Sequence, residues 1–95
     1  MRMMLKAVVD TESGNRAMAD GTVEKTIQET VERLRPEAIY FVGDEGRRSL
    51  WAVIDLDDSA RLPEISEPLF QLGARVTVTP CMNLEDLQRA MSALR

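Results

Sequence analysis

Apolar and polar side chains alternate along four short stretches of the chain, a pattern typical of β-strands with two distinct faces. We predict strands over residues 2–9, 38–43, 48–56 and 75–80. Helices are predicted over about 22–34, 59–72 and 84–94. The order of elements is therefore strand, helix, strand, strand, helix, strand and helix.

Local signals place the ends of these elements. Arg35-Pro36 ends the first helix, because the residue before a proline avoids the helical region. Pro68 cannot donate a backbone N–H, so we expect the second helix to be bent or to begin late. Gly73 is a suitable stop for that helix, and Asn83 is a suitable N-cap for the last one.

The polar segment over residues 11–21 is predicted as a connection that holds a helical turn. Its small polar groups, among them Asn15 and Arg16, make it a candidate lid or binding loop over the end of the sheet. The alternative is that Gly14 and Asn15 are simple turn and capping residues.

The two faces of the predicted sheet differ in composition. One face is purely apolar and suits a layer of helices: Met3, Leu5, Ala7, Val9, Ile39, Phe41, Leu50, Ala52, Ile54, Val76 and Val78. The other, which we call the open face, is largely apolar but carries the only Trp, the only Tyr and a Lys: Met4, Lys6, Val8, Tyr40, Val42, Trp51, Val53, Thr77 and Thr79. The predicted helices are too few to cover both faces, so the open face needs a partner or a ligand.

A second copy of the chain is the first candidate for that partner. Burying the six larger apolar residues of the open face would contribute roughly 10 kcal/mol per subunit, which is comparable to the ~4–15 kcal/mol that association costs. We therefore predict a homodimer through this face. A small apolar or carboxylate ligand, held between the sheets or between sheet and helices, is a further possibility.

Four residues of the open face are candidate ligand-binding residues: Lys6, Tyr40, Trp51 and Thr79. Lys6 and Tyr40 near Trp51 could act as an ammonium and a phenol that orient an oxyanion. Alternatively, Lys6 extends to water at the sheet edge and the Tyr40 hydroxyl bonds to the backbone.

Composition narrows the function classes. The 95 residues predict a single domain with a net charge of −4 and without a basic stripe, so we expect neither nucleic-acid nor membrane binding. One cysteine precludes an internal disulfide and suits the cytoplasm. The chain has no histidine, which removes the common catalytic triads and nearly every zinc site. We expect no metal and no cofactor, and we assign no catalytic residue.

Two charged groups have alternative interpretations. Arg47 and Arg48 at the predicted hairpin could clamp a carboxylate, or they could protect the sheet edge from aggregation. Several carboxylates could hold calcium or magnesium: Asp44, Glu45, Asp55, Asp57 and Asp58. The Asp57-Asp58 pair, however, fits no known loop spacing and suits a solvated helix start.

The order of elements resembles the dimeric α/β-barrel superfamily of small ferredoxin-like proteins. Four segments resemble uncharacterised bacterial proteins of about this length: GNRAMADGT (residues 14–22), RPEAIYF (residues 35–41), the hairpin at 44–48 and SEPLF (residues 66–70). The resemblance implies an α+β fold, namely ferredoxin-like βαββαβ with an added C-terminal helix, whose four-stranded antiparallel sheet packs open face to open face in a dimer.

That superfamily includes cofactor-free monooxygenases, isomerases, dehydratases, haem-degrading enzymes and proteins without a known activity. Many of its enzymes use a histidine, which this chain lacks. Two interpretations follow. One is a homodimeric module that binds a small molecule or a protein. The alternative is a small cofactor-independent enzyme of the monooxygenase, isomerase or lyase type, with a pocket between sheet and helices.

Overall fold

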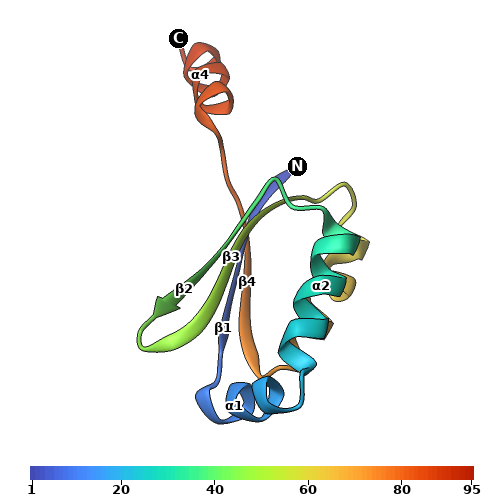
Figure 1. The fold of residues 1–95 in the computed structure, drawn as a ribbon. Coiled ribbons are helices and arrows are strands. Elements are labelled where there is room, and N and C mark those ends of the chain that lie inside the picture. The colour runs from blue at the N-terminus through green and yellow to red at the C-terminus, as the bar shows by residue number, and fades with distance from the viewer.

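Four antiparallel strands form one open sheet in a computed structural model that describes residues 1–95 (Figure 1). The strands are β1 (Arg2–Val9), β2 (Ala38–Asp44), β3 (Arg47–Asp55) and β4 (Ala74–Pro80), in the spatial order β2-β3-β1-β4. The helices are α1 (Thr11–Ala19), α2 (Thr22–Leu34), α3 (Leu62–Phe70) and α4 (Leu84–Ala93). The predicted α+β class is confirmed, and the sheet is consistent with a ferredoxin-like arrangement.

The strand register confirms the predicted separation of the two faces. Lys6 on β1 lies opposite Trp51 on β3 and Thr77 on β4, and Trp51 lies opposite Tyr40 on β2. Directly opposed residues share a face in an antiparallel sheet. The open face is therefore formed by the residues that strand alternation assigned to it.

The core lies on the opposite face of the sheet, beneath α1, α2 and α3. Leu5 and Ile54 from the sheet and Ile65 and Leu69 from α3 are its largest fully buried side chains. Removal of these side chains from water is the main favourable contribution to folding. On α2, Thr26 and Thr30 are buried, while Val31 is 37% exposed.

Residues 11–19 form a regular helix, α1, where the sequence predicted a connection with a helical turn. Asp10 caps it by accepting a hydrogen bond from the Ser13 backbone N–H, and the bonds from Ser13 lower the pKa of Asp10. Gly14 lets α1 approach the sheet, because a Cβ there would lie 3.0 Å from a methyl carbon of Val9.

Residues 59–72 form two separate elements, a 3-10 turn and a helix. A 3-10 turn at Ser59–Arg61 comes first and α3 begins only at Leu62, with Pro63 in its first turn. Pro68 lies inside the helix, which ends two residues later at Phe70. The helix thus begins three residues later than predicted, but Pro68 still lies inside it rather than in its first turn.

Two glycines with left-handed backbones provide a matched stability test. Gly73 has φ +80°, and a Cβ there would lie 2.8 Å from Ser13 Cβ, whereas Gly21 has φ +82° and open space around it. We expect Gly73→Ala to lower the free energy of unfolding by about 2 kcal/mol and Gly21→Ala by about 1 kcal/mol, because only the first adds a clash to the strain. Urea unfolding measures both, and equal losses would contradict the close approach of Gly73 to α1.

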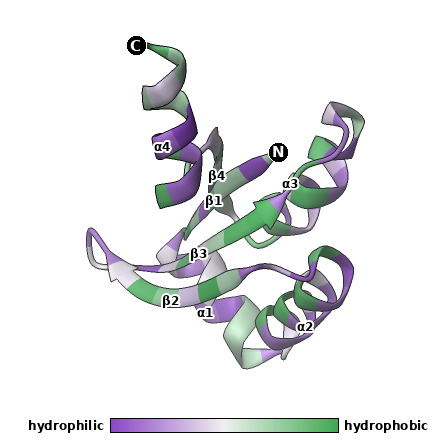
Figure 2. Ribbon diagram, turned by 90° about the horizontal axis from the view of Figure 1, so that it is seen from above, coloured by the Kyte–Doolittle hydropathy of each residue, from purple (hydrophilic) through white to green (hydrophobic).

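The last helix does not lie on the helix-covered face of the sheet. α4 projects beyond the end of the sheet at which β4 finishes (Figures 1 and 2). None of its residues is buried. Leu84, Leu87, Met91 and Leu94 recur at helical spacing in the sequence, so an apolar stripe on this helix was predictable, but the stripe contacts no core.

Candidate functional site

Lys6 lies at the centre of the open face and makes two contacts there. Its ammonium nitrogen lies 2.8 Å from an Asp44 carboxylate oxygen and 4.9 Å from the centroid of the Trp51 ring. The first contact is an ion pair and the second has the geometry of a cation–π interaction. Lys6 thus pairs with groups of the open face, while 37% of its side chain remains exposed to solvent.

Trp51 is held in place by a short chain of hydrogen bonds. Its indole Nε1–H donates to Ser49 Oγ at 3.0 Å, and the Ser49 hydroxyl donates to the Ala7 carbonyl at 3.1 Å. Ser49 is 5% exposed, so this hydroxyl is fully used inside the sheet. The indole is therefore oriented by buried groups, while 37% of Trp51 still faces solvent.

The six candidate residues from the sequence fall in two places. Lys6, Tyr40 and Trp51 are neighbours across three strands, and Thr79 lies on the same face, opposite Met4. Asn15 and Arg16 lie on α1, where they are exposed and form no loop over the sheet. Arg16 donates to Ser13 Oγ at 3.4 Å, a contact within its own helix.

Ser49 and Asp44 complete the open-face cluster; the sequence analysis did not select Ser49, and it considered Asp44 only as a possible cation ligand. Strand alternation places Ser49 on the same side as Trp51, and the hairpin pairing places Asp44 opposite Arg47. Ser49 could have been found from alternation alone. The contact between Lys6 and Asp44 could not, because it crosses β3 between residues 38 positions apart.

The principal cavity lies on the other side of the sheet, between α2 and the hairpin that joins β2 to β3. Its volume is about 630 Å³, and ten of its fifteen lining residues are hydrophobic. Val23 and Ile27 line it from α2, and Leu50 lines it from β3. Phe41 and Met18, which are 57% and 53% exposed, also line it, so the cavity is open to solvent at its edge.

Arg47 and Arg48 are the only charged residues that line this cavity. Neither forms an ion pair with a carboxylate in the chain. Arg48 lies on the helix side of β3, and a Cβ placed on Gly14 would lie 3.0 Å from its guanidinium. The cavity thus offers an apolar wall with cationic donors beside it, and no acid–base pair.

The other carboxylates considered for a cation are occupied by local contacts. Asp55 accepts a hydrogen bond from the Met1 ammonium at 2.9 Å, and Asp57 accepts one from Arg61 at 2.9 Å. Asp58 accepts a hydrogen bond from the Ala60 backbone N–H. The Arg61 hydrogen bond lowers the pKa of Asp57. Asp58 therefore caps the 3-10 turn, in line with the solvated-helix-start interpretation of the Asp57-Asp58 pair, whereas Asp55 pairs with the Met1 ammonium.

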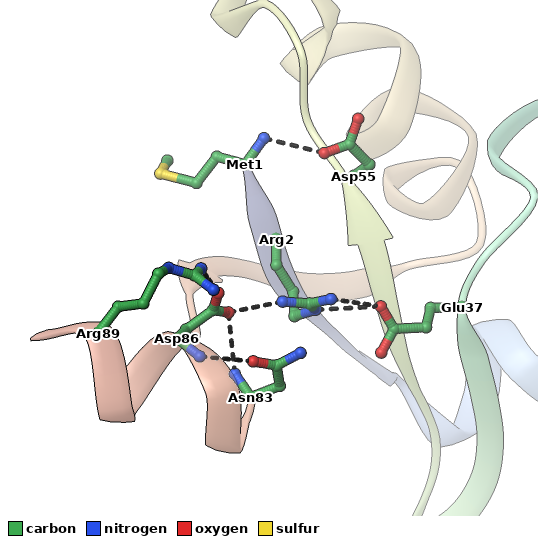
Figure 3. Close-up of polar contacts among 7 residues, drawn as sticks. All are labelled: Met1, Arg2, Glu37, Asp55, Asn83, Asp86 and Arg89. Carbon is green, nitrogen blue, oxygen red and sulfur yellow. Dashed lines mark hydrogen bonds and ion pairs between the residues drawn. The ribbon is translucent and has the colours of Figure 1, made fainter.

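A second polar cluster connects α4 to the sheet (Figure 3). Arg2 contacts Glu37 at 3.0 Å and Asp86 at 2.6 Å, so one guanidinium joins the start of β2 to the first turn of α4. Asp86 also accepts from the Asn83 backbone N–H, which is the main reason that its pKa is lowered, and it contacts Arg89.

Comparisons with known proteins identify a family for the chain but no curated relative. None of the helices combines the length and apolar character needed to cross a bilayer. No curated protein matches the chain. Residues 1–95, the whole sequence described by the structure, match a family described as Domain of unknown function (DUF3303). The chain therefore belongs to the DUF3303 family.

Proposed function

We propose that this protein is a homodimeric binding module that holds a small apolar carboxylate in the cavity between α2 and the β2–β3 hairpin. The observation that carries the proposal is an apolar cavity of about 630 Å³ that two arginines line without an ion pair of their own. Pockets for small molecules commonly have this size, an apolar lining and a few polar groups that fix orientation.

The arginines define the ligand class. A guanidinium presents a planar fork of donors that matches a carboxylate, so it binds that group with two parallel hydrogen bonds. The apolar wall, which includes Ile27, Leu50 and Phe41, suits an aromatic or aliphatic body on the same molecule. The expected ligand is therefore an aryl or alkyl acid, with its carboxylate toward Arg48.

Homodimerisation through the open face is the second part of the proposal. Tyr40 is 67% exposed and Val42 is 42% exposed, beside the partly exposed Trp51. Aromatic residues fixed in a surface are frequent centres of protein interfaces. Two such sheets packed face to face would give the dimeric α/β barrel that the order of elements suggests, with each chain as one ferredoxin-like domain.

Binding is favoured over catalysis by the lining of the cavity. General acid–base chemistry needs a group that exchanges a proton near neutral pH, and the charged lining residues are two arginines, which remain protonated. A cofactor-independent enzyme remains the second candidate, because the cavity lies between sheet and helices as such an enzyme would require.

Phenylacetate and octanoate are suitable probes, with phenylacetamide as the neutral comparison. We expect Arg48→Met to weaken carboxylate binding by about 10- to 100-fold, because a hydrogen bond to a charged group contributes about 1.5–3 kcal/mol. Binding of phenylacetamide should change little. Isothermal titration calorimetry on the purified protein measures all three affinities.

The matched control is Arg33→Met, which removes an exposed arginine from α2 outside the cavity. It should leave the affinity for both acids within about twofold of the unmodified protein, since screened surface charges act weakly over distance. Absence of binding for both acids, or equal losses in the Arg33 and Arg48 variants, would refute the proposed ligand class.

A further inference from the structure

The helix α4 carries an apolar stripe that the chain itself leaves uncovered. Its members lie on one side of the helix or just before it, and they are between 41% and 87% exposed: Met82, Leu84, Leu87, Met91 and Leu94. The helix itself is well formed, because the side chain of Asn83 and the side chain of Asp86 cap each other's backbone N–H. A helix with one apolar side is normally stabilised by packing that side against another surface.

The direction of α4 is fixed by contacts at its first turn. Arg2 holds Asp86 at 2.6 Å, and the Cys81 backbone N–H donates to the Arg2 carbonyl at 3.2 Å. Only residues 81–83 separate β4 from α4. The helix is therefore an arm presented at a defined angle to the sheet (Figures 1 and 3).

The same chain cannot cover this stripe with the exposed apolar edge of its cavity, where Phe41 and Met18 lie. β4 reaches α4 at the end of the sheet where Pro80 pairs with Met3, whereas the β2–β3 hairpin and the cavity lie at the opposite end. The molecule is 54 Å long and 17 Å thick, so the two surfaces face solvent at separate ends.

The solvent-exposed area of the chain indicates how much surface a partner would have to cover. The chain exposes 6423 Å², whereas a compact monomer of this mass exposes about 5,500 Å². Its radius of gyration is 15.0 Å, compared with about 12.4 Å for a compact chain of this length. The excess of about 900 Å² is close to the ~800 Å² that each partner buries in a stable protein–protein interface. A partner that covers this excess would therefore bury about as much area as a stable dimer needs.

We propose that α4 is an exchanged arm. Its apolar stripe packs on a second copy of this chain, against Phe41 and Met18 at the edge of that copy's cavity. In a two-fold pair each subunit gives one arm and receives one, so both uncovered surfaces are buried in a closed assembly. The arm then closes the partner's cavity from the side. This inference rests on the proposed homodimer and not on the proposed ligand.

Disulfide trapping between two different chains tests where the arm lies. Both chains carry Cys81→Ser; one also carries Met91→Cys, and the other carries Phe41→Cys with a longer affinity tag. After the chains are mixed and mildly oxidised, we expect a covalent heterodimer as the main product on a non-reducing gel. The control replaces Met91→Cys with Ser92→Cys, on the side of α4 turned away from the stripe, and should form the heterodimer at least 10-fold more slowly.

Charge substitutions on the same helix test whether the apolar stripe stabilises the dimer. We expect Met91→Glu to raise the dimer dissociation constant at least 30-fold in sedimentation equilibrium, and Ser92→Glu to change it less than threefold. The Met91 side chain is 53% exposed within one chain, so its replacement should leave the circular dichroism spectrum of the subunit unchanged.

Three results separate this inference from the proposed function. A dimer with equal dissociation constants in the two glutamate variants, or equal trapping rates for the Met91 and Ser92 pairs, would overturn the exchanged arm while leaving the open-face dimer intact. Failure of phenylacetate and octanoate to bind would overturn the ligand while leaving the arm intact. A protein that is monomeric at 100 μM would overturn the arm and the open-face dimer together.

Discussion

Replacing Leu5 with alanine is expected to lower the free energy of unfolding by about 3–5 kcal/mol. Leu5 is 0% exposed on β1, between Ala52 of β3 and Val78 of β4. The strands on both sides fix the backbone, so the site cannot collapse around the smaller side chain and a void remains. A domain of this length is expected to have only about 5–14 kcal/mol of stability in total.

Urea unfolding at a fixed protein concentration measures this loss, because dimerisation would otherwise make the midpoint depend on concentration. The control is Lys25→Ala, which also truncates a side chain to alanine but at an exposed position on α2. Its loss should stay below about 0.5 kcal/mol. Similar losses in both variants would show that β1 is not the centre of the core.

The second large effect is expected at Tyr40, which is the most exposed aromatic residue of the open face at 67%. Tyr40→Glu should raise the dimer dissociation constant at least 100-fold, because it removes an aromatic contact and places a carboxylate in the interface. Tyr40 lies directly opposite Trp51, so the new charge would sit at the aromatic centre of the face.

Folding of the subunit should survive this change, since the side chain is already in water within one chain. Gln28→Glu, on the exposed outer side of α2, adds the same charge and should leave the dissociation constant within about twofold. Sedimentation velocity and the fluorescence of Trp51 report assembly and local environment. A Tyr40→Glu protein that remains dimeric at 1 μM would exclude the open face as the interface.

The separation of the sheet into two faces was predictable because side chains on a strand alternate with a period of two. Every residue from Met3 to Val9 falls on the predicted side, and the register with β3 extends this across the sheet. The composition of the open face was also predictable, because Lys6 and Trp51 stand among apolar residues at the alternating positions that form this face.

The helix α1 was harder to predict, since its sequence contains Gly14 and several small polar residues that are weak helix formers. Its cap at Asp10 and its packing through Gly14 against Val9 stabilise it. Both contacts depend on where the end of β1 places the chain. Asn15 and Arg16 were therefore assigned to a binding loop when they lie on a helix.

The sequence by itself determined the class of the fold, the sides of the strands and the apolar stripe of the last helix, because these follow from local periodicity and from turn residues. Tertiary structure alone decided that Arg48 reaches the α1 side of the sheet, that Asp44 pairs with Lys6, and that α4 points away from its own core. Such contacts join residues far apart in the chain. Their geometry depends on how the elements pack, and periodicity carries no information about that packing.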